Sequence, residues 1–275
     1  MKMMQPIVST IPYQVCTGNH ERRDNFTHYN FRFSMIHDRH SHHDSKTINN
    51  FYHSFDIGHA HVIMFDTEFY YYPESRGWNR IREQYEWLEN DLIKANKNRD
   101  SIPWIVVMGH RPLYCFRLGD KSCLYNQLER YKLRRGIQMF NQKNSSLQYG
   151  LEELFYKHGV DIQFYGHEHF YVRTFPLYNN ISQDYLSLSN YKDPLAPVHI
   201  VTGTAGNYEK HPPLNRKTVE NGWVAFQSSD YGFTTVKIHS SNSLEALIQQ
   251  WSAETNQIID SFRITKTSPN PAWRR

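Results

Sequence analysis

Three apolar segments of this chain are each followed by a glycine and then by polar residues that include histidine. The segments are residues 12–16, 102–108 and 160–165, and the motifs after them are Gly18-Asn19-His20-Glu21, Gly109-His110 and Gly166-His167-Glu168-His169. Short apolar runs of this kind are typical of buried strands in an α/β sheet. Because ligands of such sheets bind beyond the carboxyl ends of the strands, the pattern predicts that these polar residues gather at one edge of a sheet.

The segments between and after these strands complete an α/β pattern. Apolar residues recur with helical spacing in two segments, and further strand signals, including a pair that turns at Gly58-His59, extend to the end of the chain. The expected helices are 78–96 and 150–158, and the further strands are 50–57, 61–67, 198–202, 233–239, 244–251 and 258–264. We therefore expect an α/β sheet up to about residue 175 and a β-rich section after it.

Composition excludes several classes of protein. The chain has 275 residues, of which 39% are hydrophobic and 15% aromatic, so it can bury a core and is not a disordered chain. A net charge of +4 without an obvious cluster does not favour a nucleic-acid partner. No apolar run approaches the roughly 18 to 20 residues that a membrane span needs.

The cysteines and glycosylation sequons point to a compartment outside the cytosol. Sequons begin at Asn25, Asn144 and Asn180, and Cys115 and Cys123 are close enough in sequence for a small disulfide loop. Cys16 is expected to be a buried free thiol. The first residues lack the apolar region and cleavage site of a signal peptide. An extracytoplasmic glycoprotein whose N-terminal region precedes this sequence would reconcile these signals.

The polar residues after the strands are candidate metal ligands. A single histidine after a strand is usually only a polar loop residue, but here three such segments follow one another in order. The candidates are Asn19, His20, His110, His167 and His169. Imidazole nitrogens with one amide oxygen suit zinc, iron or manganese rather than calcium or magnesium. The sequence thus predicts a transition-metal site at the sheet edge.

This ordered set resembles the calcineurin-like metallophosphoesterases, and more narrowly the purple acid phosphatases, especially the animal iron/zinc purple acid phosphatase-like proteins. Other segments carry the resemblance across nearly the whole chain: Asn25-Phe26-Thr27, Trp87-Leu88-Glu89-Asn90-Asp91-Leu92, Met108-Gly109-His110-Arg111-Pro112 and Pro197-Val198-His199-Ile200-Val201-Thr202-Gly203. The resemblance implies an αββα sandwich, with a metallophosphoesterase domain over residues 1–175 and a purple acid phosphatase C-terminal domain over residues 194–266.

The resemblance also implies a function. Such a protein is an acid phosphatase that hydrolyses small phosphomonoesters by attack of a metal-bound hydroxide at a dinuclear centre, and it is secreted or lysosomal. Asn19, His110 and His167 match ligands of the divalent metal, which is zinc, manganese or iron. His169 matches a ligand of the second metal, Fe(III). His20 matches the residue that contacts the phosphate or protonates the leaving oxygen.

One departure from the family pattern limits this inference. The family has an Asp-x-Gly and a Gly-Asp-x-x-Tyr motif upstream of Gly-Asn-His, whereas the 17 residues before Gly18 contain no Asp or Glu. The bridging aspartate and the tyrosine ligand are therefore missing, and we expect an N-terminally truncated chain with an incomplete sheet. Two alternatives stay open: a catalytically incomplete fragment or pseudo-phosphatase, and a phosphodiesterase or nuclease of the same superfamily.

Three other segments have less specific interpretations. Residues 37–44 hold the densest run of histidines, which fits a solvated loop better than a metal-binding tract. The basic stretch 121–135 fits a solvated helix face, with attraction of an anionic substrate as the alternative. Tyr70, Tyr71 and Tyr72 either line a substrate rim or pack in the core.

Overall fold

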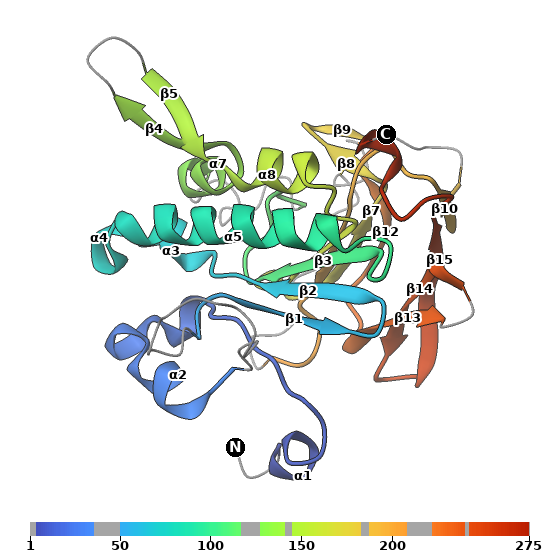
Figure 1. Cartoon of the computed structure of the whole chain (residues 1–275). Helices are drawn as coiled ribbons and strands as arrows, with labels where there is room; N and C mark the ends of the chain where they lie inside the picture. The colour runs from blue at the N-terminus through green and yellow to red at the C-terminus, as the bar shows by residue number, and fades with distance from the viewer. Residues whose placement is uncertain are drawn as a thin grey trace.

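The computed structural model describes residues 4–35, 50–116, 127–140, 145–182, 187–207, 222–239 and 242–274. Its main element is a mixed seven-stranded sheet (Figure 1). In spatial order the strands are β1 (His53–Ile57), β2 (Ala60–Met64), β3 (Trp104–Gly109), β6 (Ile162–Tyr165), β11 (Val198–Thr202), β7 (Tyr171–Thr174) and β12 (Val224–Ser228). The four strands from β2 to β11 are parallel, so their carboxyl ends share one edge.

Strands β2 and β3 are buried on both faces because apolar residues occupy consecutive positions. On β3, Ile105 and Val107 belong to the core on the helical side of the sheet, whereas Trp104 and Val106 belong to the core on its other side. This division follows from the two-residue period of a strand. The hairpin of β1 and β2, with Ile57 paired to Ala60 around Gly58-His59, confirms the predicted strand pair.

Helices cover one face of this sheet. They are α3 (Glu68–Tyr71), α5 (Asn79–Lys97), α7 (Gln127–Arg135) and α8 (Leu151–Lys157), and α5 and α8 confirm the two predicted helices. Figure 1 shows α5 and α8 lying along the sheet on the same side. Ile81, Leu88 and Leu92 recur at helical spacing on the buried side of α5, which packs this helix onto the sheet.

A four-stranded sheet covers the other face. Its order is β10 (Asn190–Lys192), β15 (Gln257–Thr265), β14 (Asn242–Ser252) and β13 (Gly232–His239). Ile248 and Phe262 from this sheet share a core with Trp104 and Val106 from β3. The described residues therefore form a helical layer and two sheets, three of the four layers of the expected sandwich. The α/β class and the β-rich C-terminal section are confirmed.

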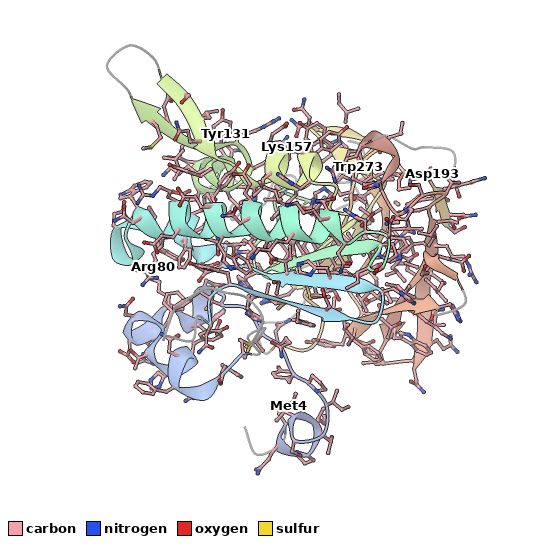
Figure 2. All side chains as sticks on the ribbon, in the orientation of Figure 1. Met4, Arg80, Tyr131, Lys157, Asp193 and Trp273 are labelled. Carbon is pink, nitrogen blue, oxygen red and sulfur yellow. The ribbon has the colours of Figure 1, made fainter. Side chains whose placement is uncertain are left out.

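The remaining elements lie around these layers. The chain contributes two small hairpins, formed by β4 (Gly136–Phe140) with β5 (Ser145–Tyr149) and by β8 (Leu177–Tyr178) with β9 (Ile181–Ser182). The short helices are α1 (Gln5–Val8), η1 (Asn19–Phe26), α2 (Thr27–Arg32), α4 (Pro73–Arg76) and η3 (Ala272–Arg274). Trp273 of η3 stacks on Tyr156 and donates to its carbonyl oxygen, which ties the C-terminal segment to α8 (Figure 2).

The strand predicted at residues 12–16 is wrong. This segment has no regular secondary structure and pairs with no strand in the part of the chain that the structure describes. Side chains satisfy its backbone instead, because Val15 N–H donates to Met35 Sδ and Tyr29 O–H donates to the Val15 carbonyl. An apolar run becomes a strand only where a neighbouring strand offers a hydrogen-bonding edge.

The predicted division between residues 175 and 194 stays a prediction. Strand β11, which follows this division, lies between β6 and β7, which precede it. The large sheet therefore contains residues from both proposed domains. None of the helices described here is long and apolar enough to cross a membrane.

Candidate metal centre

Three of the predicted ligands converge on one point at the carboxyl edge of the sheet. Nε2 of His110 lies 2.7 Å from Oδ1 of Asn19 and 3.1 Å from Nδ1 of His167. The third side of this triangle, from His167 Nδ1 to Asn19 Oδ1, measures 3.2 Å. Asn19 opens η1, His110 follows β3 and His167 follows β6, so three segments far apart in sequence supply the three donor atoms.

The local backbone explains this convergence. A Cβ atom on Gly18 would lie 2.8 Å from the His110 ring, so any residue other than glycine would collide with the ring in its present position. His167 has a φ of 63°, a left-handed conformation that costs a non-glycine residue on the order of 1 kcal/mol. Strained backbone of this kind is found disproportionately at functional sites.

Burial keeps both histidines neutral. Desolvation lowers the pKa of His110 to about 3, and the charges of Arg111, His20 and His169 act in the same direction. The pKa of His167 falls to about 2 for the same reasons, with Arg111 as the strongest charge. Neutral imidazole is the form that binds metals, and each neutral ring keeps one nitrogen lone pair well into the acidic range.

Arg111 is a residue of this site that the sequence did not single out. It is 4% exposed, and its Nη1 lies 3.0 Å from His167 Nε2. Its Nε donates to Oε1 of Glu68 at 2.7 Å, and Glu68 itself is fully buried. Desolvation raises the pKa of Glu68, although the charge of Arg111 opposes this. An available signal was the position of Arg111 directly after a candidate ligand.

His20 and His169 lie near the three converging residues without joining them. His20 is exposed in η1, and His169 is half-buried four residues after the end of β6. Both are close enough to His110 to lower its pKa through their charge. Glu168, which lies between the two candidate ligands His167 and His169, forms an ion pair with Arg130 of α7 at 3.7 Å. Its carboxylate is thus engaged by a helix that the sequence interpreted as solvated.

The triangle fits one metal ion. Tetrahedral zinc ligands at about 2.0–2.2 Å lie about 3.3–3.6 Å from one another, so the observed 2.7–3.2 Å would have to lengthen by a few tenths of an ångström or more. Two imidazoles and an amide oxygen suit zinc, manganese or iron. Among the described residues no three His, Cys, Asp or Glu side chains are grouped for a metal, and the triangle reaches three donors only through the Asn19 amide oxygen.

The other predicted site residues are placed as follows. Asn25 and Asn180 are exposed, whereas Asn144 lies outside the described residues. Cys115 is disulfide-bonded, but Cys123 lies outside the described residues, so their pairing stays a prediction. Cys16 is a half-buried free thiol.

The less specific segments also have outcomes. The histidine run at 37–44 lies outside the described residues, as does the first part of the basic stretch, whose remainder forms α7. Tyr70 and Tyr71 are buried in the core, which agrees with the packing interpretation. Tyr72 is half-buried, and its hydroxyl accepts a hydrogen bond from Arg111 Nη2 at 3.3 Å.

Comparison with known proteins decides the family. Residues 1–171 match the family described as calcineurin-like phosphoesterase. The chain belongs to this family. Residues 196–261 match a second family, described as iron/zinc purple acid phosphatase-like protein C. The two matches agree with the resemblance to the calcineurin-like metallophosphoesterases and the purple acid phosphatases that the motifs indicated.

Individual relatives agree with this assignment. Acid phosphatase type 7 of Homo sapiens is 38% identical over 267 residues, which are 97% of this chain and 56% of that protein. Probable inactive purple acid phosphatase 24 of Arabidopsis thaliana is 27% identical over 96% of this chain and 39% of its own length. The structure of purple acid phosphatase PPD1 from yellow lupin (Lupinus luteus) seeds has a TM-score of 0.67 and 25% identity, covering 96% of this chain and 42% of that one. The chain thus spans about half the length of the curated relatives it matches.

Proposed function

We propose that this calcineurin-like phosphoesterase carries the divalent-metal site of an acid phosphatase and acts in the hydrolysis of phosphomonoesters. The observation that carries the proposal is the convergence of Asn19 Oδ1, His110 Nε2 and His167 Nδ1 within 3.2 Å of one another. The similarity to acid phosphatase type 7 supports the choice of reaction.

The roles follow from the chemistry of each side chain. Asn19, His110 and His167 would hold zinc, manganese or iron, and a metal ion bound there supplies Lewis acidity toward the phosphoryl oxygens. Arg111 and Arg130 both lie near His167, and each is paired with a buried carboxylate, Glu68 and Glu168 respectively. We assign proton donation to the leaving oxygen to His20, which is exposed in η1 next to Asn19.

A second, iron site belongs to the proposal only as far as this chain supplies it. His169 is the single residue that we assign to iron, and we derive no step of the reaction from that site. Among the described residues no group of three His, Cys, Asp or Glu side chains supports such a site.

We also propose that the protein works outside the cytosol, secreted or in lysosomes. Asn25 and Asn180 are exposed and accessible to glycosylation, and the sequence places Cys115 and Cys123 close enough for a disulfide. Enzymatic removal of N-glycans from the secreted protein should lower its apparent mass. An unchanged mass would remove this support.

A second candidate function is that of a catalytically incomplete member of the family. It is favoured by the donor set, which holds two histidines and an amide but no carboxylate. One relative of this chain, purple acid phosphatase 24 of Arabidopsis thaliana, is itself described as probably inactive. Under this alternative the chain would bind a metal ion or a phosphorylated ligand without hydrolysing it.

The test compares hydrolysis of p-nitrophenyl phosphate with that of bis(p-nitrophenyl) phosphate in the presence of added zinc. We expect hydrolysis of the monoester, its loss in His110→Ala, and its retention in His239→Ala, because His239 is an exposed histidine on β13. A preference for the diester, or activity unaffected by His110→Ala, would overturn the proposal. Zinc binding without hydrolysis would favour the catalytically incomplete alternative.

A further inference from the structure

The contact between Arg111 and His167 fixes the direction of one hydrogen bond. Arg111 Nη1 lies 3.0 Å from His167 Nε2. A guanidinium group in a protein stays protonated, carries five N–H donors and has no acceptor. Arg111 therefore donates and His167 Nε2 accepts.

This direction also fixes the proton on the imidazole ring. A neutral histidine carries one N–H, and because Nε2 accepts a hydrogen bond, the proton lies on Nδ1. Nδ1 faces Asn19 Oδ1 at 3.2 Å, an oxygen that can accept it. Nδ1 is, however, the same atom that the triangle offers to a metal, and a nitrogen that binds a metal carries no proton. Metal binding there needs the other tautomer, whose Nε2–H would point at the Arg111 donor.

Arg111 is held firmly in this position. Its Nε is paired with buried Glu68 at 2.7 Å, and its Nη2 donates to the Tyr72 hydroxyl at 3.3 Å. The guanidinium carbon also lies 4.1 Å from the centre of the Tyr71 ring. All three guanidinium nitrogens are thus engaged, and the group does not leave His167 without losing contacts.

We propose that Arg111, positioned by Glu68, gates metal binding by holding His167 in the tautomer that cannot bind a metal through Nδ1. Metal enters the triangle only when Arg111 turns away from His167. Arg111 is in this sense a positioning residue that acts through His167. The inference rests on the proposed function, because it takes the triangle to be a metal site.

The test uses the double variant R111M/E68Q. It removes one positive and one negative charge, so the net charge near the triangle is unchanged and no buried charge is left unpaired. Zinc affinity of the metal-free full chain is measured by competition with a chelator, and circular dichroism checks the fold. We expect R111M/E68Q to bind zinc about tenfold more tightly than the natural chain, the effect of losing one hydrogen bond to a charged group. The matched control E68Q keeps the Arg111 donor and should show no such gain.

A second readout needs no metal. Nitrogen NMR of ¹⁵N-histidine-labelled chain, with His167→Gln to assign the signal, should show Nδ1–H in the natural chain and Nε2–H in R111M/E68Q. An Nε2–H signal in the natural chain, or equal zinc affinity in the natural chain and the folded double variant, would overturn the gate and leave the metal site standing. Absence of zinc binding in both would overturn the metal site and the gate with it.

Discussion

Gly18 is the residue on which the geometry of the candidate metal centre depends most directly. A Cβ atom there would lie 2.8 Å from the His110 ring, although its φ of −127° and ψ of −177° suit any residue. The requirement for glycine is therefore steric rather than conformational. Gly166 offers a contrast, because its Cβ would meet the same ring at an ordinary 3.7 Å.

This contrast gives a prediction about metal affinity. Gly18→Ala should displace the His110 ring and weaken zinc binding about tenfold or more, as loss of support for a ligand commonly does. Gly166→Ala should leave the affinity unchanged. Calorimetric titration of both variants with zinc measures the difference, and equal affinities would contradict the packing described here.

His61 lies between two carboxylates at the start of β2, with Nδ1 2.6 Å from Asp56 and Nε2 3.0 Å from Asp91. Burial alone would lower its pKa, but the hydrogen bonds and charges of Asp91 and Asp56 outweigh burial and raise it. The folded state therefore binds this proton more tightly than the unfolded chain does. The stabilisation is present below about pH 6.5 and is lost as pH rises through the raised pKa.

The prediction follows from that sign. The free energy of unfolding is compared at two pH values, one below about 6.5 and one well above the raised pKa of His61. From the lower to the higher pH, the natural chain should lose more of this free energy than His61→Gln, which has no imidazole proton to release. Urea unfolding at the two pH values measures both losses. If the stability of the two proteins depended on pH in the same way, Asp56 and Asp91 would not be raising the pKa of His61.

At the scale of elements, a buried ion pair joins the two sheets. Arg173 of β7 donates from Nε and Nη2 to the two oxygens of Asp260 on β15, at 2.7 and 2.9 Å. The side chains are 2% and 5% exposed. The pair Arg80 and Glu83 on α5 is instead about half exposed on both sides, with Arg80 at the outer end of the helix (Figure 2).

These two pairs should respond differently to the loss of their acid. Asp260→Ala should lower the free energy of unfolding by about 3–5 kcal/mol, because it leaves the Arg173 charge buried and unpaired. Glu83→Ala should cost less than about 1 kcal/mol. Urea unfolding distinguishes them, and similar losses would mean that Asp260 does not hold the sheets together.

A strand could be predicted from the sequence where its own residues show its burial, but not where its burial depends on a partner far away in the chain. The parallel strands β3, β6 and β11 were predicted because both of their faces are buried and most of their residues are therefore apolar. Residues 12–16 have the same pattern but pair with no strand among the described residues. Strand β7 was missed because it is short and carries Arg173, whose burial depends on Asp260 in a distant strand.

The same reasoning applies to the candidate site. Asn19, His110 and His167 were recognisable because each follows a glycine at the end of an apolar run. Arg111 and Glu68 were not, because tertiary contacts bury them: Arg111 lies against the Tyr71 ring, donates to the Tyr72 hydroxyl and pairs with Glu68. The local sequence reveals which residues follow a strand. It does not reveal which charged groups from other parts of the chain will pack beside those residues.

At the scale of the whole molecule, the candidate metal centre lies at the edge of the large sheet, where β3 and β6 end. This chain contributes an amide oxygen and two neutral imidazoles to that edge, and it spans about half the length of its curated relatives. Three donors at one point are enough to hold one metal ion, and we propose that the residues of this chain bind one.

Titration of the metal-free chain with zinc tests that assignment most directly. We predict a single zinc ion per chain, with Asn19→Ala, His110→Ala and His167→Ala each abolishing its binding while the fold is retained. The exposed control His239→Ala should bind zinc as the natural chain does. Zinc binding that survives the loss of His110, or a natural chain that binds no zinc at all, would contradict the account.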